Sequence, residues 1–181
     1  EFIDTDEELR RLLPALISIK DKNPSSLLSV DTFNAEVAFK ALEQGANWIN
    51  DVTTGRRDPD IFRVVSDAKC PYILTHSRGT SKNMNKLCVY DDLIPNIIEE
   101  LSESTNEALK FGISEKNIIW DPGLGFAKDT EQNLTILKEL EVFTKGNFPI
   151  LIGPSRKRFI GDVISEPNAR KRIWGTNAVV C

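Results

Sequence analysis

Short apolar runs alternate along the chain with longer segments whose apolar residues recur at helical spacing. The apolar runs are rich in Ile, Leu and Val and do not clearly alternate with polar residues, as expected for parallel strands buried on both faces. We predict five strands, at Ser26–Val30, Asn47–Ile49, Tyr72–Leu74, Ile118–Trp120 and Phe148–Ile152. Five consecutive strand–helix units favour an α/β fold with a parallel sheet and right-handed crossovers.

Helical periodicity predicts six helices around these strands. They are expected at Asp4–Ile19, Ala35–Gln44, Pro59–Ala68, Asp91–Phe111, Thr130–Leu140 and Asn168–Val180. Asp4 or Thr5 is the expected N-cap of the first helix. Gly45 and Gly112 are expected to end the second and fourth helices, because glycine readily adopts the left-handed conformation that follows many helices.

A polar residue or a turn follows each predicted strand. The most informative case is Asn117–Lys128, where the apolar run stops at Asp121 and Pro122, Gly123 and Gly125 impose a turn. The carboxyl ends of parallel strands are where α/β folds place ligands. From this segment alone two interpretations stay open: Asp121 meets a polar group of a ligand, or it caps the turn.

Composition limits the possible partners. The chain has 181 residues and a net charge of −4, so neither nucleic acid nor an anionic membrane is expected as a partner. No apolar run has the length of a membrane span, and no signal peptide opens the chain. The three cysteines lack metal-site spacing, which favours an intracellular protein with reduced thiols.

The two ends of the chain predict a part of a longer protein. The sequence begins at Glu1 without a methionine, and it ends at Cys181 inside an apolar helical run that has no stop signal. We therefore expect residues 1–181 to form a single domain that is incomplete at both ends.

Five strand-end motifs resemble, in order, those of dihydropteroate synthases. They are S-V-D-T (29–32), I-N-D-V (49–52), H-S-R-G (76–79), D-P-G-L-G-F-A-K (121–128) and G-P-S-R-K (153–157). The resemblance covers nearly the whole chain, and the last two motifs are the most specific. The stretch around the last motif is most similar to the synthase half of plant-type bifunctional enzymes, in which a hydroxymethyl-dihydropterin pyrophosphokinase precedes the synthase.

This resemblance implies a (β/α)8 TIM barrel, of which the chain would supply about strands 3 to 7. It implies a transferase that joins p-aminobenzoate to 7,8-dihydropterin-6-ylmethyl diphosphate and releases pyrophosphate in folate biosynthesis. It also implies Mg²⁺ as a cofactor, with its Asn ligand upstream of Glu1, and an Arg–His pair for the diphosphate after Cys181. No metal ligand is expected within the chain itself.

The resemblance also assigns the substrate-binding residues. Asp31, Asn50, Asp121 and Lys157 match the family's pterin contacts, and Lys157 is the expected catalytic cation. An ionised Asp121 can accept two parallel N–H bonds, which suits the amino group and ring N–H of a pterin. Phe126, Ser155 and Lys157 match the family's contacts to p-aminobenzoate.

The remaining polar side chains near these motifs are expected to support the site or to face solvent. His76, the only histidine, is expected to have a structural role, because an arylamine that displaces a diphosphate needs no strong base. Arg156 and Arg158 are expected to face solvent. The chain departs from the family pattern at Thr75, where Met is usual, and at Ala127, where Gly is common.

Two other functions stay open. One is a methyl-tetrahydrofolate-binding methyltransferase of the same barrel family, although the G-P-S-R-K motif and Phe126 favour the synthase. The other is a non-catalytic pterin-binding module. The resemblance allows a fused pyrophosphokinase domain and a homodimer, and a plant-type protein would be mitochondrial or cytosolic.

Overall fold

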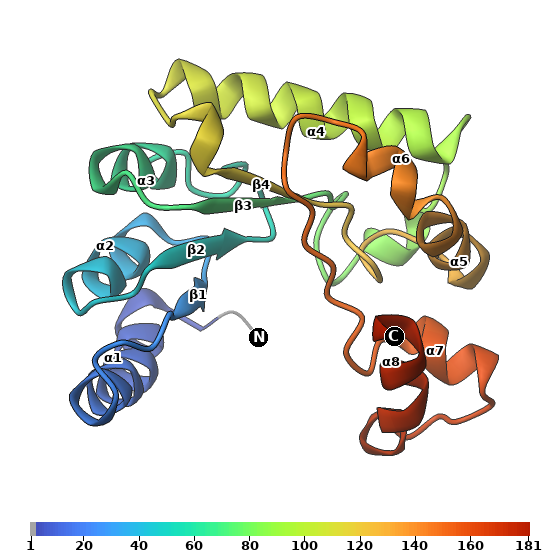
Figure 1. Ribbon diagram of the computed structural model, residues 1–181, viewed down its shortest axis with the longest axis horizontal. Helices are drawn as coiled ribbons and strands as arrows, with labels where there is room; N and C mark the ends of the chain where they lie inside the picture. The colour runs from blue at the N-terminus through green and yellow to red at the C-terminus, as the bar shows by residue number, and fades with distance from the viewer. Residues whose placement is uncertain (1–2) are drawn as a thin grey trace. The chain divides into compact units, whose positions relative to one another are not determined.

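A computed structural model describes residues 3–181 and has an α/β fold (Figure 1). The helices are α1 (Thr5–Lys22), α2 (Ala35–Glu43), α3 (Ile61–Ala68), α4 (Leu93–Lys110), α5 (Thr130–Lys138), α6 (Leu140–Thr144), α7 (Arg158–Val163) and α8 (Ile173–Val180). The strands are β1 (Ser29–Asp31), β2 (Trp48–Asp51), β3 (Tyr72–Thr75) and β4 (Ile118–Asp121). Three 3₁₀ turns are also described, η1 (Met84–Lys86), η2 (Glu115–Asn117) and η3 (Ala169–Lys171).

The strands form one sheet in the order β1-β2-β3-β4, which is the sequential order expected of neighbouring strands in the barrel that the resemblance implies. The first two pairings are parallel, with Val30 opposite Ile49 and Asn50 opposite Ile73. All four residues of β3 are buried, which agrees with its continuous apolar run. The prediction of strands in sequential order is therefore confirmed for these four strands.

The fifth predicted strand is reduced to a single bridge. Within Phe148–Ile152 only Ile150 pairs, in parallel with Trp120. Trp120 N donates to Pro149 O at 2.9 Å, and Leu151 N donates to Trp120 O at 2.8 Å. Pro149 has no N–H to donate, and a turn at Ser155–Arg156 follows the run. The direction of the pairing agrees with the prediction, but its length was overestimated.

The predicted helices are present, with changes at their ends. Asp4 is the N-cap of α1, and its side chain accepts a hydrogen bond from Glu7 N at 2.9 Å. Gly45 and Gly112 follow α2 and α4 with φ of 92° and 89°, as the C-cap prediction requires. The segments predicted as Thr130–Leu140 and Asn168–Val180 are each interrupted, into α5 and α6 and into η3 and α8.

The described chain divides into two units, which we describe separately. The first unit comprises the residues up to Thr75 together with Glu103–Ile119. Its core contains side chains from the sheet and from α2 and α3 that are inaccessible to solvent, among them Val37, Ile49, Ile61 and Tyr72. Figure 1 shows α2 and α3 beside β2 and β3, where they cover this part of the sheet.

The second unit comprises His76–Ser102 and Trp120–Cys181. Leu124, Ile136 and Phe143 are buried in it, and the rings of Trp120 and Phe148 stack with their centroids 4.8 Å apart. Asp129 begins α5 with a capping box, in which its side chain accepts from Gln132 N and the Gln132 side chain accepts from Asp129 N. The capping box therefore fixes where the segment between β4 and α5 ends and α5 begins.

Within residues 3–181, no helix combines the length and the apolar character that crossing a membrane requires. Cys70 is buried, Cys88 is half-buried and Cys181 is exposed, and all three are free thiols.

Candidate active site

The first unit brings together two of the residues predicted to bind a pterin. Asp31 and Asn50 are register partners at the carboxyl ends of β1 and β2. Asn50 Nδ2 donates to Asp31 Oδ2 at 3.3 Å, and Thr75 Oγ1 donates to Asn50 Oδ1 at 3.4 Å. Asp31 is exposed and Asn50 is half-buried. A carboxylate and an amide thus lie side by side where a flat heterocycle with donors and acceptors could meet them.

Asp51, which the sequence showed only as a member of the I-N-D-V motif, holds the loop after β2. Its carboxylate is fully buried and accepts from Thr53 N, Thr53 Oγ1 and Gly55 N, each at 2.7 Å, and from Tyr72 Oη at 2.8 Å. These four donors offset the cost of burying the charge. The hydrogen bonds fix the backbone that follows Asn50.

Tyr72→Phe is expected to lower the free energy of unfolding by about 1–3 kcal/mol, because it removes one donor from the buried Asp51 carboxylate. Chemical denaturation of both proteins measures this difference. Tyr90→Phe is the matched control, because the Tyr90 hydroxyl donates to a backbone carbonyl, that of Ala127, from a half-buried ring. Equal losses for the two variants would contradict a special contribution of the Asp51–Tyr72 contact.

The second unit contains Asp121, the last residue of β4. Asp121 is 6% exposed, and its Oδ1 atom accepts from Gly123 N at 2.7 Å across the turn. Burial raises the pKa of Asp121 to about 6, although the Gly123 hydrogen bond and the positive charges of Lys157 and Lys128 act in the opposite direction. At pH 7 and above the carboxyl group is therefore mainly ionised and able to accept N–H bonds.

Lys157 and Phe126 lie together in the same unit. Lys157 is the N-cap of α7, and its Nζ atom lies 4.2 Å from the centroid of the Phe126 ring. The electrostatic influence of Lys157 reaches Asp121. Ser155 is exposed in the turn before α7. Lys157 thus lies against the Phe126 ring and acts electrostatically on Asp121, while the roles predicted for these residues stay a prediction.

The positions that the sequence singled out beside the site also agree with expectation. Arg156 and Arg158 are exposed. Ala127 is 1% exposed and has φ of 48°, a left-handed conformation that glycine adopts without strain. Ala127→Gly would therefore relieve backbone strain at this position.

Two cavities lie among the described residues. The smaller, of about 210 Å³, is in the second unit and includes Gly125, Lys128, Asn133, Lys157 and Phe159 in its lining. The larger, of about 570 Å³, is in the first unit at the loops that precede β3 and β4, and is lined by residues such as Ser66, Lys69 and Lys116. No predicted site residue lines the larger cavity. We assign the site by the chemistry of its side chains and not by cavity size.

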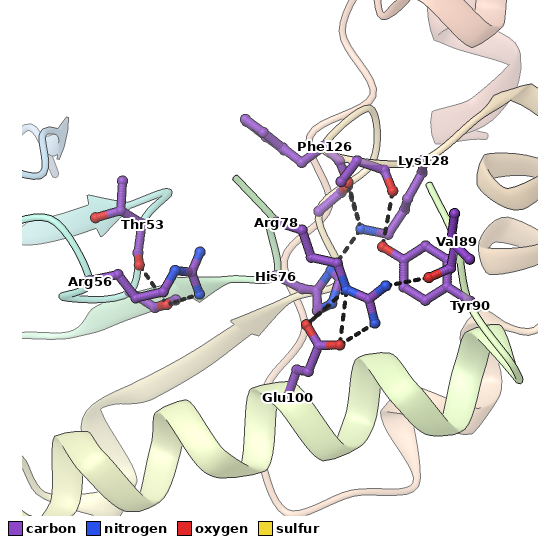
Figure 2. A network of polar contacts seen from close by, with 12 residues as sticks. Thr53, Arg56, His76, Arg78, Val89, Tyr90, Glu100, Phe126 and Lys128 are labelled. Carbon is purple, nitrogen blue, oxygen red and sulfur yellow. Dashed lines mark hydrogen bonds and ion pairs between the residues drawn. The ribbon is translucent and has the colours of Figure 1, made fainter. Parts of the chain in front are cut away.

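A network of charged and polar side chains in the second unit joins the buried His76 and Lys128 to the half-buried Arg78 and Glu100 (Figure 2). His76 is buried, with its Nδ1 2.8 Å from Lys128 Nζ and its Nε2 3.1 Å from Glu100 Oε2. Arg78 binds the same Glu100 carboxylate through Nε and Nη2 and lies 3.9 Å from the Tyr90 ring centroid. The structural role predicted for His76 agrees with this burial.

Sequence analysis did not identify Lys128 and Glu100 as members of this network. Lys128 occurred only as the last letter of the D-P-G-L-G-F-A-K motif, and Glu100 lay within the predicted helix Asp91–Phe111 without being singled out. No local signal identifies either residue, because their contacts join positions 52 and 24 residues apart in the sequence.

Among residues 3–181, no group of three or more His, Cys, Asp or Glu side chains could hold a metal ion. The predicted Asn ligand to Mg²⁺ belongs to a segment upstream of Glu1, so this finding does not test the prediction.

Comparisons with known proteins give the family. The chain matches the family "Pterin binding enzyme" over residues 1–181. It is 39% identical to a dihydropteroate synthase of Synechocystis over its whole length, which is 62% of that protein. It is 40% identical to a folate synthesis bifunctional protein of Arabidopsis thaliana, where 98% of this chain matches 40% of that protein. The similar identities do not single out the plant type.

The fold is also that of a solved relative. The dihydropteroate synthase of Xanthomonas albilineans in complex with 7,8-dihydropteroate superposes with a TM-score of 0.90 at 32% identity, over 98% of this chain and 64% of that one. The chain thus spans less than two thirds of the length of each of these proteins. Because the family match covers every residue, the chain belongs to the pterin-binding enzyme family.

Proposed function

We propose that the chain is the central part of a dihydropteroate synthase. The observation that carries this proposal is the second unit, in which the buried Asp121 carboxylate, the Phe126 ring and the Lys157 ammonium lie together. The relatives support the same activity, since dihydropteroate synthases of Synechocystis and Xanthomonas albilineans are similar to the whole chain. On this proposal β1 to β4 and the bridge at Ile150 are strands 3 to 7 of a (β/α)8 barrel.

The proposed pterin contacts involve two pairs of side chains. Asp121 accepts hydrogen bonds from the 2-amino group and the adjacent ring N–H of the pterin. Asn50 and Asp31 form hydrogen bonds with the other polar atoms along the edge of the pterin ring. Lys157 donates to the pterin and supplies positive charge near the reacting carbon. The existing Asn50–Asp31 hydrogen bond, at 3.3 Å, supports a pair that is already oriented before the ligand arrives.

The reaction is a displacement at the methylene carbon of the pterin. A bond forms between the arylamine nitrogen and this carbon, the carbon–oxygen bond to the diphosphate breaks, and the arylamine loses one proton to solvent. The protein has to hold the two substrates in line and to stabilise charge on the departing diphosphate. Lys157 is the proposed cation on the pterin side. Mg²⁺ would add charge at the diphosphate, but the described residues offer it no cluster of ligands, and we assign no step to it.

The proposed p-aminobenzoate site consists of Phe126, Ser155 and Lys157. Phe126 packs beside the arene, the Ser155 hydroxyl donates to the carboxylate, and Lys157 orders the Phe126 ring through the cation–π contact. The exposed position of Ser155 supports this role, because the carboxylate end of the substrate is expected to lie nearer to solvent than the pterin.

Ser155→Ala is expected to raise the KM for p-aminobenzoate by roughly tenfold, because a hydrogen bond to a charged group contributes about 1.5–3 kcal/mol. The Kd for the pterin should change by less than about twofold, since other residues hold it. Sulfonamides mimic the arylamine, so their inhibition constant should rise with the KM. Steady-state kinetics with both substrates varied measures these effects, and Ser165→Ala in the exposed segment after α7 is the control.

The test of the activity is the formation of dihydropteroate by the complete protein. Supplied with dihydropterin-methyl diphosphate and p-aminobenzoate, it should release one pyrophosphate for each dihydropteroate formed. Binding of methyl-tetrahydrofolate without dihydropteroate formation would indicate the methyltransferase instead. Pterin binding without either reaction would indicate a non-catalytic module. A fused pyrophosphokinase, a homodimer and a mitochondrial or cytosolic location stay predictions.

A further inference from the structure

The turn that carries Asp121 encloses a buried lysine. Asp121 O accepts from His76 N at 2.8 Å, and Asp121 Oδ1 accepts from Gly123 N at 2.7 Å. Behind this turn, Lys128 is 3% exposed and points its ammonium group back into the loop. The backbone of residues 121–128 therefore folds around the side chain of Lys128, the last residue of the segment.

The three hydrogens of the Lys128 ammonium match three acceptors. Nζ lies 3.1 Å from Gly123 O, 3.0 Å from Phe126 O and 2.8 Å from His76 Nδ1 (Figure 2). Through the first two contacts, the Gly123 and Phe126 carbonyl groups of the turn bind the same ammonium group. An ammonium group has three donors and no acceptor, so its contact with His76 requires an unprotonated Nδ1.

His76 and Glu100 orient this ammonium group. With Nδ1 as acceptor, the imidazole carries its proton on Nε2, which donates to Glu100 Oε2 at 3.1 Å. Burial lowers the pKa of His76 to about 4, which agrees with a neutral ring. Burial raises the pKa of Glu100, but the hydrogen bonds from His76 and Arg78 outweigh this effect and lower the pKa to about 2. The Glu100 carboxylate is therefore ionised. The three side chains are therefore linked by two hydrogen bonds of defined direction. Lys128 Nζ donates to His76 Nδ1, and His76 Nε2 donates to Glu100.

We infer that Lys128, oriented by Glu100 through His76, is a positioning residue that fixes the turn presenting Asp121 and Phe126 to the ligand. This inference rests on the proposed function, because it concerns how the pterin-binding carboxylate is held. Lys128 acts from behind the turn through the carbonyl groups of Gly123 and Phe126. Asp121 and Phe126 make the contacts with the substrates.

The protonation state of Lys128 is expected to make pterin affinity depend on pH. Burial lowers the pKa of Lys128 to about 7, against the raising effects of Asp121 and Glu100. The other charged or titratable groups that act on it are Arg78 and Cys88, while the neutral His76 faces it directly. Loss of the proton leaves two donors for three acceptors, so the turn loosens and pterin affinity should fall as the pH rises above about 7.

The first experiment compares the complete unmodified protein with Lys128→Met by calorimetric titration of a dihydropterin ligand from pH 6.5 to 9. The variant should bind roughly 10- to 100-fold more weakly at pH 6.5, since a small misplacement of binding groups has effects of this size. It should also lack the decline at alkaline pH that the unmodified protein shows. Equal affinities, or the same alkaline decline in both proteins, would overturn the inference.

Two substitutions of His76 separate its two contacts. In His76→Asn the side-chain amide oxygen occupies the place of the imidazole Nδ1 and can accept from Lys128. In His76→Gln the side-chain amide nitrogen replaces Nε2 and can donate to Glu100. His76→Asn should retain pterin affinity within about threefold, and His76→Gln should lose roughly tenfold. Affinity in His76→Gln equal to or better than in His76→Asn would overturn the inference.

A measurement on the unmodified protein covers the case in which variants fold poorly. The ¹⁵N chemical shifts of His76 at pH 6.5 should indicate an unprotonated Nδ1 and a protonated Nε2. The opposite tautomer, or an imidazolium ring, would overturn the inference. Absence of any dihydropterin binding by the unmodified protein would instead refute the proposed function, while the histidine shifts would still report on the Lys128 contact.

Discussion

Asp121→Asn is expected to reduce dihydropterin affinity by at least roughly tenfold and, at the same time, to stabilise the ligand-free protein. An amide offers one acceptor where the pterin presents two donors, so one N–H is left without a partner at a cost of about 1–3 kcal/mol. The Asn oxygen can still accept from Gly123 N, as Asp121 Oδ1 does at 2.7 Å. The turn should therefore keep its geometry while the binding chemistry is lost.

The stability effect follows from the pKa of Asp121. Burial raises this pKa from 3.8 to about 6, so the folded protein holds the proton more tightly than the unfolded chain. The native state is therefore favoured at low pH, and this contribution is lost as the pH rises through about 6. The difference between a pKa of 3.8 and one of about 6 lowers the free energy of unfolding at neutral pH by about 3 kcal/mol as an upper value. Asp121→Asn removes that cost.

Chemical denaturation of both proteins at pH 4 and pH 7.5, with calorimetric titration of the pterin at pH 7.5, measures the two effects. The variant should be more stable by about 1–3 kcal/mol at pH 7.5, and this advantage should shrink at pH 4. In the unmodified protein, pterin affinity should also fall by up to about tenfold per pH unit below pH 6, as Asp121 is protonated. Unchanged pterin affinity in the variant would remove Asp121 from the site.

Gly123→Ala is expected to destabilise the fold by about 2–5 kcal/mol. Gly123 has φ of 72°, a conformation that costs other residues about 1–2 kcal/mol. A Cβ atom at this position would lie 1.9 Å from His76 O, and the backbone shift needed to relieve this overlap costs about 1–3 kcal/mol more. Because His76 N also donates to Asp121 O, the shift should displace Asp121 as well.

Gly153→Ala is the matched control, because a Cβ atom built at Gly153 meets nothing within 4 Å. Urea denaturation of the two variants and the unmodified protein should give a large loss for Gly123→Ala and less than about 1 kcal/mol for Gly153→Ala. Similar stabilities for the two variants would contradict the close packing of the Gly123 turn against the backbone of His76.

Much of the secondary structure could be predicted because local signals decide it. Four of the five predicted strands end within a residue or two of the observed ones, since a polar residue or a turn stops each apolar run. The fifth was predicted too long, because periodicity does not reveal whether a neighbouring strand pairs along the whole run. The breaks at Glu139 and Arg172 were also missed, since the apolar periodicity continues across both.

The residues proposed to contact the ligand could be named from the sequence, whereas the residues that support the Asp121 turn could not. Asp31, Asn50 and Asp121 lie at the carboxyl ends of strands, and Lys157 lies at the start of α7 after the turn that follows the Ile150 bridge, so their positions can be predicted along the chain. Lys128 contacts His76, 52 residues away in sequence, and His76 contacts Glu100 after a further 24 residues. Such long-range hydrogen bonds leave no local pattern, and a charged residue that is buried looks in sequence like one that is solvated.

A crystal structure of the complete protein with 7,8-dihydropteroate bound would show at once whether Asp121 is the residue that recognises the pterin. We expect the 2-amino group and the adjacent ring N–H of the pterin both to donate to the Asp121 carboxylate. We also expect Asn50 to contact the opposite part of the ring edge and the p-aminobenzoyl ring to lie beside Phe126. A pterin ring bound elsewhere, with Asp121 making no contact to it, would contradict the proposed site.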